Sequence, residues 1–310
     1  MKQFDLHNHT IVSKDGATEA RKIIDIAVMR GLSGIGICDH DEFPDENLYD
    51  YASSKGIKLA LGVEFSCQKA HIIGYNMSRI NELDKVFLGN KFDELREDYV
   101  NVAKTMIKAL AETGVDISIE KVQNAFNKKK IQKLFVMKYM AEYLDLGFTN
   151  WSDARKWLQR KEEQTQNEAK KTGKDTLPPS FYPKDGSGVR SFDPLEIIEL
   201  IHRSGGYAIW AHPFITPGDK RKEYLEQFYN YGIDAVEANY AYKENGYKGN
   251  ETNDELEEVI RGWLIDYNIP VSGGSDSHYP LKTYKNNKPI MPGDFGVTHK
   301  EIEKIAFIFK

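Results

Sequence analysis

Short apolar runs that end in acidic or histidine side chains recur along both flanks of this chain. Residues 58–63 run into Glu64, for example, and residues 207–211 run into His212. Amphipathic stretches and turn residues separate these runs, which predicts β-strands that alternate with α-helices and pair mainly in parallel. Because parallel strands present their carboxyl ends at one edge, we expect the polar side chains that follow them to meet there.

The expected helices follow from apolar spacing and from capping residues. Residues 18–30 place apolar side chains on one helical face, and Asp193, followed by Pro194 and Glu196, marks a helix start. Together with the strands between them, these segments make about seven strand–helix units. Helices are predicted at residues 18–30, 45–55, 193–204, 224–231 and 254–267, with a last one after Thr298.

Two α/β architectures are compatible with such an alternation, an open doubly wound sheet and a closed barrel. The doubly wound sheet usually carries its ligand chemistry at one or two loops near the switch point, whereas a barrel uses the ends of many strands. Here five or six strand ends carry polar residues, which favours the barrel.

The alternation stops near residue 79, and helical periodicity replaces it up to about residue 183. Apolar residues at positions 92, 95, 99, 102, 106 and 110 form one long stripe, and further helices are predicted at 119–126, 131–146 and 151–171. We therefore expect a barrel domain made of residues 1–78 and 190–310. Residues 79–189 are expected to form an all-α insertion that serves as a lid over the substrate.

The insertion carries an excess of positive charge. Residues 126–174 contain 12 Lys or Arg and 6 Asp or Glu, whereas the whole chain has a net charge of -5. A solvated helix face is one explanation, and an electrostatic lid for an anionic substrate is another. The overall acidity argues against nonspecific binding of nucleic acid or membranes by the whole surface.

No targeting or membrane segment is expected. The first motif begins within the first few residues, and no run of about 18 uncharged apolar residues occurs. Cys38 and Cys67 are the two cysteines, which more often indicates buried reduced thiols than a disulfide. A cytoplasmic location follows, and no protein partner is implied.

His7 and His9 lie two residues apart at the end of an extended run, so their side chains point the same way and can bind one metal ion. Six of the eight histidines fall near strand ends, and only His202 and His299 do not. Imidazoles pooled with carboxylates predict a polynuclear site for Zn²⁺, Mn²⁺ or Fe²⁺. The pooled residues are His7, His9, Asp15, Asp39, His40, Glu64, His71, His212, Asp276 and His278.

Five short motifs follow one another along the chain. They are Asp5-Leu6-His7-Asn8-His9-Thr10, Cys38-Asp39-His40-Asp41, Gly62-Val63-Glu64, Ala211-His212-Pro213 and Gly274-Ser275-Asp276-Ser277-His278. In this order they resemble the motifs of the PHP (polymerase and histidinol phosphatase) family. The resemblance covers about residues 1–78 and 190–300, and the helical insertion is similar to that of a bacterial branch with nucleoside 3',5'-bisphosphate phosphatases and a 5'-3' exonuclease on short RNA.

The resemblance implies a distorted (β/α)7 TIM-like barrel that holds three divalent metal ions. It implies a first metal bound by His7, His9, Glu64 and Asp276, a second bound by Glu64, His71 and His212, and a third bound by Asp15, His40 and His278. The chain departs from the family at one point, where Lys14 adds one residue before Asp15.

Asp39 and Asp41 flank His40 and can either orient its imidazole or serve as turn or helix caps. A histidine or aspartate near the third metal is expected to protonate the leaving group. The residues that we assign to catalysis are Asp39, His40, Glu64 and His278.

The metal donors predict a phosphoesterase that hydrolyses a phosphate monoester of a small nucleotide-like metabolite, of the nucleoside 3',5'-bisphosphate type, with a metal-bridging hydroxide as nucleophile. Neither a Walker-type phosphate loop nor a Gly-x-Ser-x-Gly motif is present. Three alternatives stay open. They are a nuclease acting on short RNA or a cyclic-phosphate hydrolase, an amidohydrolase, and a noncatalytic metal-binding module.

Four cationic residues of the insertion are candidates for holding a second phosphate of the substrate. In the resembling phosphatases, arginines of this region bind the phosphate that is not cleaved. Arg160 matches one of them, and Lys133 stands where an arginine is usual, although a lysine cannot form the planar fork. The candidates are Lys133, Arg155, Lys156 and Arg160.

Overall fold

The computed structural model describes residues 3–128, 130–172, 180–183, 189–215, 220–284 and 288–309. These residues form two compact units, one made of residues 1–89 and 191–310 and the other of residues 90–190. We call them the barrel unit and the helical unit.

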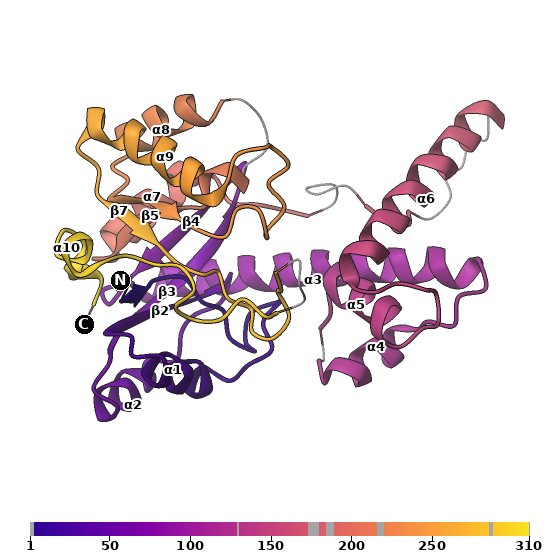
Figure 1. The fold of residues 1–310 in the computed structure, drawn as a ribbon, viewed down its shortest axis with the longest axis horizontal. Coiled ribbons are helices and arrows are strands. Elements are labelled where there is room, and N and C mark those ends of the chain that lie inside the picture. The colour runs from indigo at the N-terminus through magenta and orange to yellow at the C-terminus, as the bar shows by residue number, and fades with distance from the viewer. Residues whose placement is uncertain are drawn as a thin grey trace. The chain divides into compact units, whose positions relative to one another are not determined.

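A seven-stranded sheet forms the centre of the barrel unit, with the strands in chain order from β1 to β7 (Figure 1). The backbone N–H of Leu6 donates to Gly273 O at 3.1 Å, which links the first strand to the last and nearly closes the sheet. The predicted (β/α)7 TIM-like barrel is therefore confirmed. The strands are β1 (Phe4–Asp5), β2 (Gly34–His40), β3 (Lys58–Cys67), β4 (Ala70–Tyr75), β5 (Tyr207–Ala211), β6 (Ala235–Asn239) and β7 (Val271–Gly273).

The helices of the barrel unit pack on the outside of this sheet, with α1 and α2 on one side and α8 and α9 on the other (Figure 1). Asp193 caps α7 through the N–H of Leu195, and Thr298 forms a capping box with Glu301, as their sequence spacing predicts. The helices are α1 (Ala20–Met29), α2 (Leu48–Ser54), α7 (Pro194–Arg203), α8 (Arg221–Asn230), α9 (Asn253–Tyr267) and α10 (His299–Ile302), with 3₁₀ turns η1 (Pro213–Ile215) and η2 (Ala306–Ile308).

One strand of the barrel, β4, runs against its neighbours. It pairs antiparallel with both β3 and β5, whereas β1–β2, β2–β3, β5–β6 and β6–β7 pair in parallel. The reversal follows a tight turn in which Lys69 has a φ of 60°. Because β4 is reversed, its first residues lie at the edge where the parallel strands end, and His71 pairs with Ser66 there.

Two apolar clusters support this arrangement. One fills the barrel interior with residues such as Leu6, Tyr75 and Ile209, and the Tyr75 hydroxyl donates to the carbonyl oxygen of Leu6. The other joins α1 and α2 to β2 and β3 through residues such as Ile24 and Leu59. Burial of these side chains stabilises the sheet from both faces, and it leaves the polar residues gathered at one edge.

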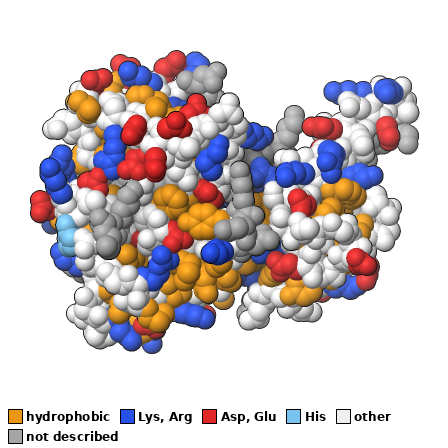
Figure 2. All heavy atoms as spheres, viewed as in Figure 1, with side chains coloured by type: hydrophobic (Ala, Val, Ile, Leu, Met, Phe, Trp, Pro, Cys, Tyr) orange, Lys and Arg blue, Asp and Glu red, His pale blue; other side chains and the backbone are white. Residues whose placement is uncertain are grey.

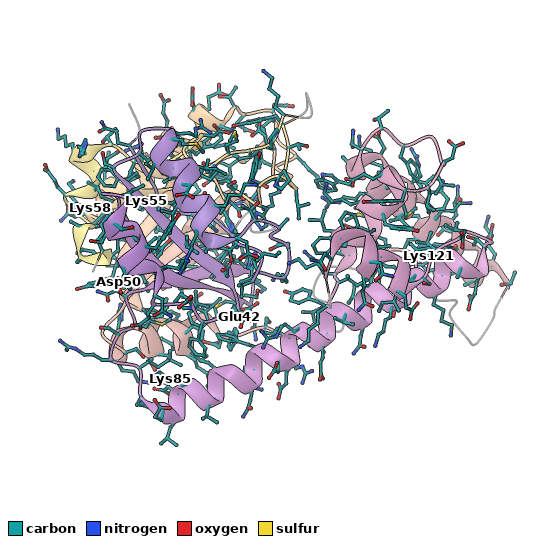
Figure 3. All side chains as sticks on the ribbon, turned by 90° about the horizontal axis from the view of Figure 1, so that it is seen from below. Glu42, Asp50, Lys55, Lys58, Lys85 and Lys121 are labelled. Atoms are coloured by element: carbon teal, nitrogen blue, oxygen red, sulfur yellow. The ribbon has the colours of Figure 1, made fainter. Side chains whose placement is uncertain are left out.

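The described elements of the helical unit are all α-helices, beginning with the C-terminal part of the continuous helix α3, whose early residue Lys85 is labelled in Figure 3. Of the predicted stripe, Phe92, Leu95, Met106 and Leu110 are buried, while positions 99 and 102 are half-buried. No described helix has the length and apolar character that a membrane span requires. The helices are α3 (Glu82–Glu112), α4 (Ile119–Phe126), α5 (Lys133–Glu142) and α6 (Trp151–Thr172).

Candidate metal centre

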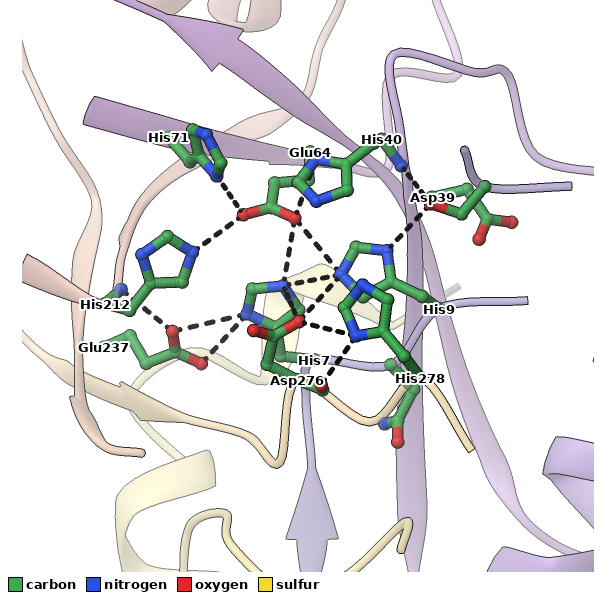
Figure 4. A network of polar contacts seen from close by, with 12 residues as sticks. His7, His9, Asp39, His40, Glu64, His71, His212, Glu237, Asp276 and His278 are labelled. Atoms are coloured by element: carbon green, nitrogen blue, oxygen red, sulfur yellow. Dashed lines mark hydrogen bonds and ion pairs between the residues drawn. The ribbon is translucent and has the colours of Figure 1, made fainter. Parts of the chain in front are cut away.

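The nine side chains predicted as metal ligands come together at one edge of the barrel, and Figure 4 shows most of them. All are buried except His71, which is half-buried. They extend from the ends of β1 and β5, from the turn that precedes α1, from the strands β2, β3 and β4, and from the segment after β7. They are His7, His9, Asp15, His40, Glu64, His71, His212, Asp276 and His278.

The first group consists of His7, His9 and Asp276. The Nε2 atoms of the two histidines are 3.1 Å apart, and Asp276 Oδ1 lies 3.1 Å from His9 Nε2 and 3.7 Å from His7 Nε2. The segment after β7 runs beside residues 7–9, because the N–H of His9 donates to Ser277 O at 2.9 Å. This backbone pairing brings Asp276 to the two histidines.

Glu64 faces two groups of donors at once. Its Oε2 lies 3.2 Å from His7 Nε2 and 3.1 Å from His9 Nε2, and its Oε1 lies 2.8 Å from His71 Nδ1 and 2.9 Å from His212 Nε2. The carboxylate therefore separates the first group from a second group, made of His71 and His212. Glu64 belongs to β3 itself and pairs with His40 on β2, so the expectation that the strand ends before it was wrong.

His71 lies at the start of a strand, β4, whereas His7, His212 and His278 follow strands. The reversed direction of β4 explains how it still reaches the common edge.

Asp15, His40 and His278 form the third group, which His9 adjoins. Asp15 Oδ1 lies 3.0 Å from His278 Nε2, and Asp15 Oδ2 lies 3.7 Å from His40 Nε2. The extra residue before Asp15 therefore leaves its carboxylate among these histidines.

Lys14, the extra residue, turns toward the ends of β2 and β3. Its Nζ lies 3.1 Å from Ser66 Oγ and 3.7 Å from Asp41 Oδ2. The preceding residue, Ser13, donates to Asp15 Oδ1 at 2.9 Å and orients that carboxylate.

Several donor atoms fit bound cations better than they fit one another. Among the described residues, Asp276 Oδ1, His40 Nδ1 and His278 Nε2 are buried and take part in no hydrogen bond. Buried polar atoms that make no hydrogen bond are costly, and imidazole nitrogens beside carboxylate oxygens suit divalent transition metals. The centre is therefore suited to divalent metal ions.

The electrostatics of the centre agree with this assignment. Burial alone would lower the pKa of His9, yet the carboxylates of Asp276 and Glu64 raise it to about 10. Burial alone would raise the pKa of Glu64, but the surrounding histidines hold it well below its usual range. The centre favours positive charge between its ligands, as a metal ion would supply.

Asp39 and Asp41, which were predicted to orient His40, form hydrogen bonds between neighbouring segments of the barrel edge. Asp39 accepts hydrogen bonds from the N–H and the hydroxyl of Thr10, at 2.6 Å and 2.7 Å. Asp41 accepts from the N–H and the hydroxyl of Ser66, at 2.9 Å and 2.7 Å. These bonds join the ends of β1, β2 and β3.

The sequence reasoning missed Glu237, which lies in β6 and is buried. His7 Nδ1 is 3.2 Å from its Oε1, and the N–H of His212 donates to its Oε2 at 2.9 Å. Glu237 thus orients one proposed ligand through its ring and another through its backbone. The available sequence signal was an acidic residue inside the strand, between Val236 and Ala238.

In the helical unit, two of the four cationic candidates converge on one aromatic ring. Lys133 Nζ lies 5.0 Å and Arg155 Cζ lies 6.0 Å from the ring centre of Tyr182. Lys156 and Arg160 are exposed. On the face shown in Figure 2, Lys and Arg side chains are interspersed with Asp and Glu.

Comparison with known proteins identifies the family. The model of the PHP domain matches residues 5–176. A 5'-3' exoribonuclease from Haemophilus influenzae is 24% identical over 286 residues, which covers 90% of this chain and 91% of that protein.

Two solved structures share the fold. One is a metal-dependent phosphoesterase candidate from Bifidobacterium adolescentis, with a TM-score of 0.68 and 20% identity over 98% of this chain and 96% of that one. The other is an amidohydrolase from Chromobacterium violaceum with bound sulfate and no metal, with a TM-score of 0.69 and 18% identity over 99% and 97%. The PHP model spans more than half of the residues, and the chain belongs to the PHP domain family.

Proposed function

We propose that this PHP-domain hydrolase, which acts on phosphate esters, removes the phosphate of a monoester of a small nucleotide-like metabolite, of the nucleoside 3',5'-bisphosphate type. The observation that carries the proposal is the position of Glu64, whose two oxygens face separate groups of histidines. A carboxylate between two groups of imidazoles is suited to hold two ions at the spacing that phosphoester hydrolysis uses.

The protein's residues have distinct roles in this proposal. Bound divalent ions would supply an activated water and neutralise charge on the phosphoryl group. Glu64 would set the positions of two ions relative to each other, and Asp39 holds the loop that carries His9 by accepting from the N–H of Thr10. His40 and His278 lie beside Asp15, where the three side chains would hold a further ion close to the leaving group.

We further propose three ions, of Mn²⁺, Zn²⁺ or Fe²⁺. The support is that the donors form several overlapping groups of three or four, which we propose to divide among three ions. The proposed ligand sets are His7, His9, Glu64 and Asp276; Glu64, His71 and His212; and Asp15, His40 and His278. Imidazole and carboxylate donors suit these metals.

The helical insertion, residues 79–189, is proposed to select the substrate as a lid. Lys133 and Arg155 provide two positive charges at Tyr182, and an anionic group such as a second phosphate complements that arrangement. The fold relative from Chromobacterium violaceum binds sulfate, which has the shape of phosphate. Cytoplasmic action is consistent with free, buried Cys38 and Cys67.

The test is a phosphoester panel with Mn²⁺-reconstituted protein and a His7→Ala, His9→Ala double variant as the matched control. The panel contains nucleoside 3',5'-bisphosphates, mononucleotides and simple sugar phosphates, and inorganic phosphate release is measured. We expect the bisphosphate to give the highest kcat/KM. Equal rates for the wild type and the double variant on every ester would refute the proposal.

A nuclease acting on the 5' end of short RNA, the activity named for the Haemophilus relative, is the second candidate. The positive charge of residues 126–174 favours it, because a nucleic-acid backbone is polyanionic. A labelled short RNA separates the two candidates, since a nuclease releases mononucleotides stepwise and a phosphatase leaves the chain length unchanged. Cyclic phosphates belong in the same assay.

A further inference from the structure

The two oxygens of Asp276 have different surroundings. Oδ1 is buried, takes part in no hydrogen bond with the described residues, and lies 3.1 Å from His9 Nε2. Oδ2 accepts hydrogen bonds from the Lys282 ammonium and from the Tyr240 hydroxyl, both at 2.6 Å. One oxygen therefore faces the proposed metal position, and the other is bound by the protein.

The two donors to Oδ2 differ in charge and in setting. Tyr240 follows β6 directly and is fully buried, with its ring 5.0 Å from that of His212. Lys282 follows the segment that contains Asp276 and His278, and its side chain is 22% exposed, so it reaches the carboxylate from the solvent side. Tyr240 contributes a neutral hydrogen bond, and Lys282 contributes a full positive charge.

We propose that Tyr240 and Lys282 are positioning residues that restrict Asp276 to a one-oxygen metal ligand, and that the Lys282 charge weakens metal binding at His7, His9 and Asp276. The inference rests on the proposed metal centre. Its physical basis is that an ammonium group in contact with a ligand carboxylate withdraws charge from it and repels a nearby cation.

Loss of the Lys282 charge and loss of the Tyr240 hydroxyl should change Mn²⁺ affinity in opposite directions, which makes the inference testable. Removing the Lys282 charge should tighten Mn²⁺ binding, because the repulsion disappears while Tyr240 still holds Oδ2. Removing the Tyr240 hydroxyl should weaken binding, because Asp276 then loses a fixed orientation without any change in charge. If Lys282 only held Asp276 in place, removing it would weaken Mn²⁺ binding, just as removing the Tyr240 hydroxyl should.

The experiment titrates metal-free protein with Mn²⁺ by calorimetry. For Lys282→Met we expect one dissociation constant to fall on the order of tenfold. Lys282→Arg keeps the charge and should bind like the wild type, and Tyr240→Phe should bind more weakly. Lys300→Met, an exposed change of the same chemistry on α10, is the matched control and should leave every constant unchanged.

Thermal unfolding with and without metal gives a second readout. Lys282→Met should lower the melting temperature of the metal-free protein, in which Asp276 loses its cation, but not that of the Mn²⁺-loaded protein. Unchanged or weaker Mn²⁺ binding by Lys282→Met, with normal binding by the wild type, would overturn this inference alone. A wild type that binds no Mn²⁺ would overturn the proposed metal centre with it.

Discussion

Glu237 Oε1 lies 3.2 Å from His7 Nδ1, and the opposite nitrogen of the same ring, Nε2, lies 3.2 Å from Glu64 Oε2. The imidazole of His7 is thus oriented by Glu237 at Nδ1, while its Nε2 faces Glu64. This arrangement fixes which ring nitrogen is available to a metal ion.

Substituting Glu237 is expected to weaken metal binding without unfolding the barrel. Glu237→Gln keeps an acceptor for His7 and for the N–H of His212 but removes the charge, so the Mn²⁺ dissociation constant should rise on the order of tenfold. Calorimetric titration measures it. Glu258→Gln, an exposed change on α9, is the control, and equal effects of both substitutions would contradict the role of Glu237.

Asp15→Asn is expected to lower the number of bound metal ions by about one. Its carboxylate is the acidic member of the group with His40 and His278, and an amide is a poor ligand for a transition metal. Metal content after dialysis, measured by mass spectrometry, reports the change. The exposed Asp50→Asn should retain the full content. An unchanged content in Asp15→Asn would remove Asp15 from the ligand set.

The cationic pair at Tyr182 is expected to act on substrate binding. Lys133→Ala and Arg155→Ala should each raise KM for a bisphosphate about tenfold or more, as loss of a charge-assisted contact implies, with little change in kcat. Lys170→Ala, an exposed change near the end of α6, serves as the control. Steady-state kinetics on a monophosphate should show no effect of these substitutions. Equal losses on both substrates would argue against recognition of a second phosphate.

The ion pair between His202 and Asp234 is expected to contribute more to the stability of the metal-free protein at low pH than at high pH. Its hydrogen bond with Asp234, 2.9 Å long, raises its pKa above the ordinary 6.5. A raised pKa means that the folded state binds the proton more tightly. The stabilisation is therefore complete below the ordinary pKa and is lost as pH rises through the raised value.

The effect should stay below about 1 kcal/mol, because this ion pair is partly exposed and screened by solvent. Chemical denaturation of the wild type and of His202→Gln in chelator, across a pH series, measures the difference in free energy of unfolding. That difference should shrink as pH rises. Asp234→Asn should abolish the same pH dependence, and a difference that is constant with pH would refute the assignment.

The sequence predicted the barrel because its strands carry alternating or continuous apolar patterns with acidic and imidazole residues near their ends. It predicted the gathering of His7, His9 and Asp276 for the same reason. It could not predict the direction of β4, because the hairpin turns at Lys69, a residue that seldom adopts a positive φ, and no glycine marks the turn.

The sequence also could not predict the residues that contact a proposed ligand and orient it. Glu237 contacts a histidine 230 positions away, and Tyr240 meets Asp276 across 36 positions. Neither belongs to a motif whose spacing reveals its partner. Closure of the sheet brings His7 to Glu237, and the pairing of β6 with β7 brings Tyr240 to Asp276. Their identification required the three-dimensional structure.

The reversed strand β4 also determines where the insertion is attached. Because β4 runs away from the metal-donor edge, the chain leaves it at Tyr75, at the opposite edge, and only then enters α3. It re-enters the barrel at Phe192, whose N–H donates to Ser66 O at 3.0 Å beside the β3–β4 hairpin. The insertion can thus change in length without altering the loops that carry the ligands, because the returning chain is already bonded at Phe192 to the strand pair that bears Glu64 and His71.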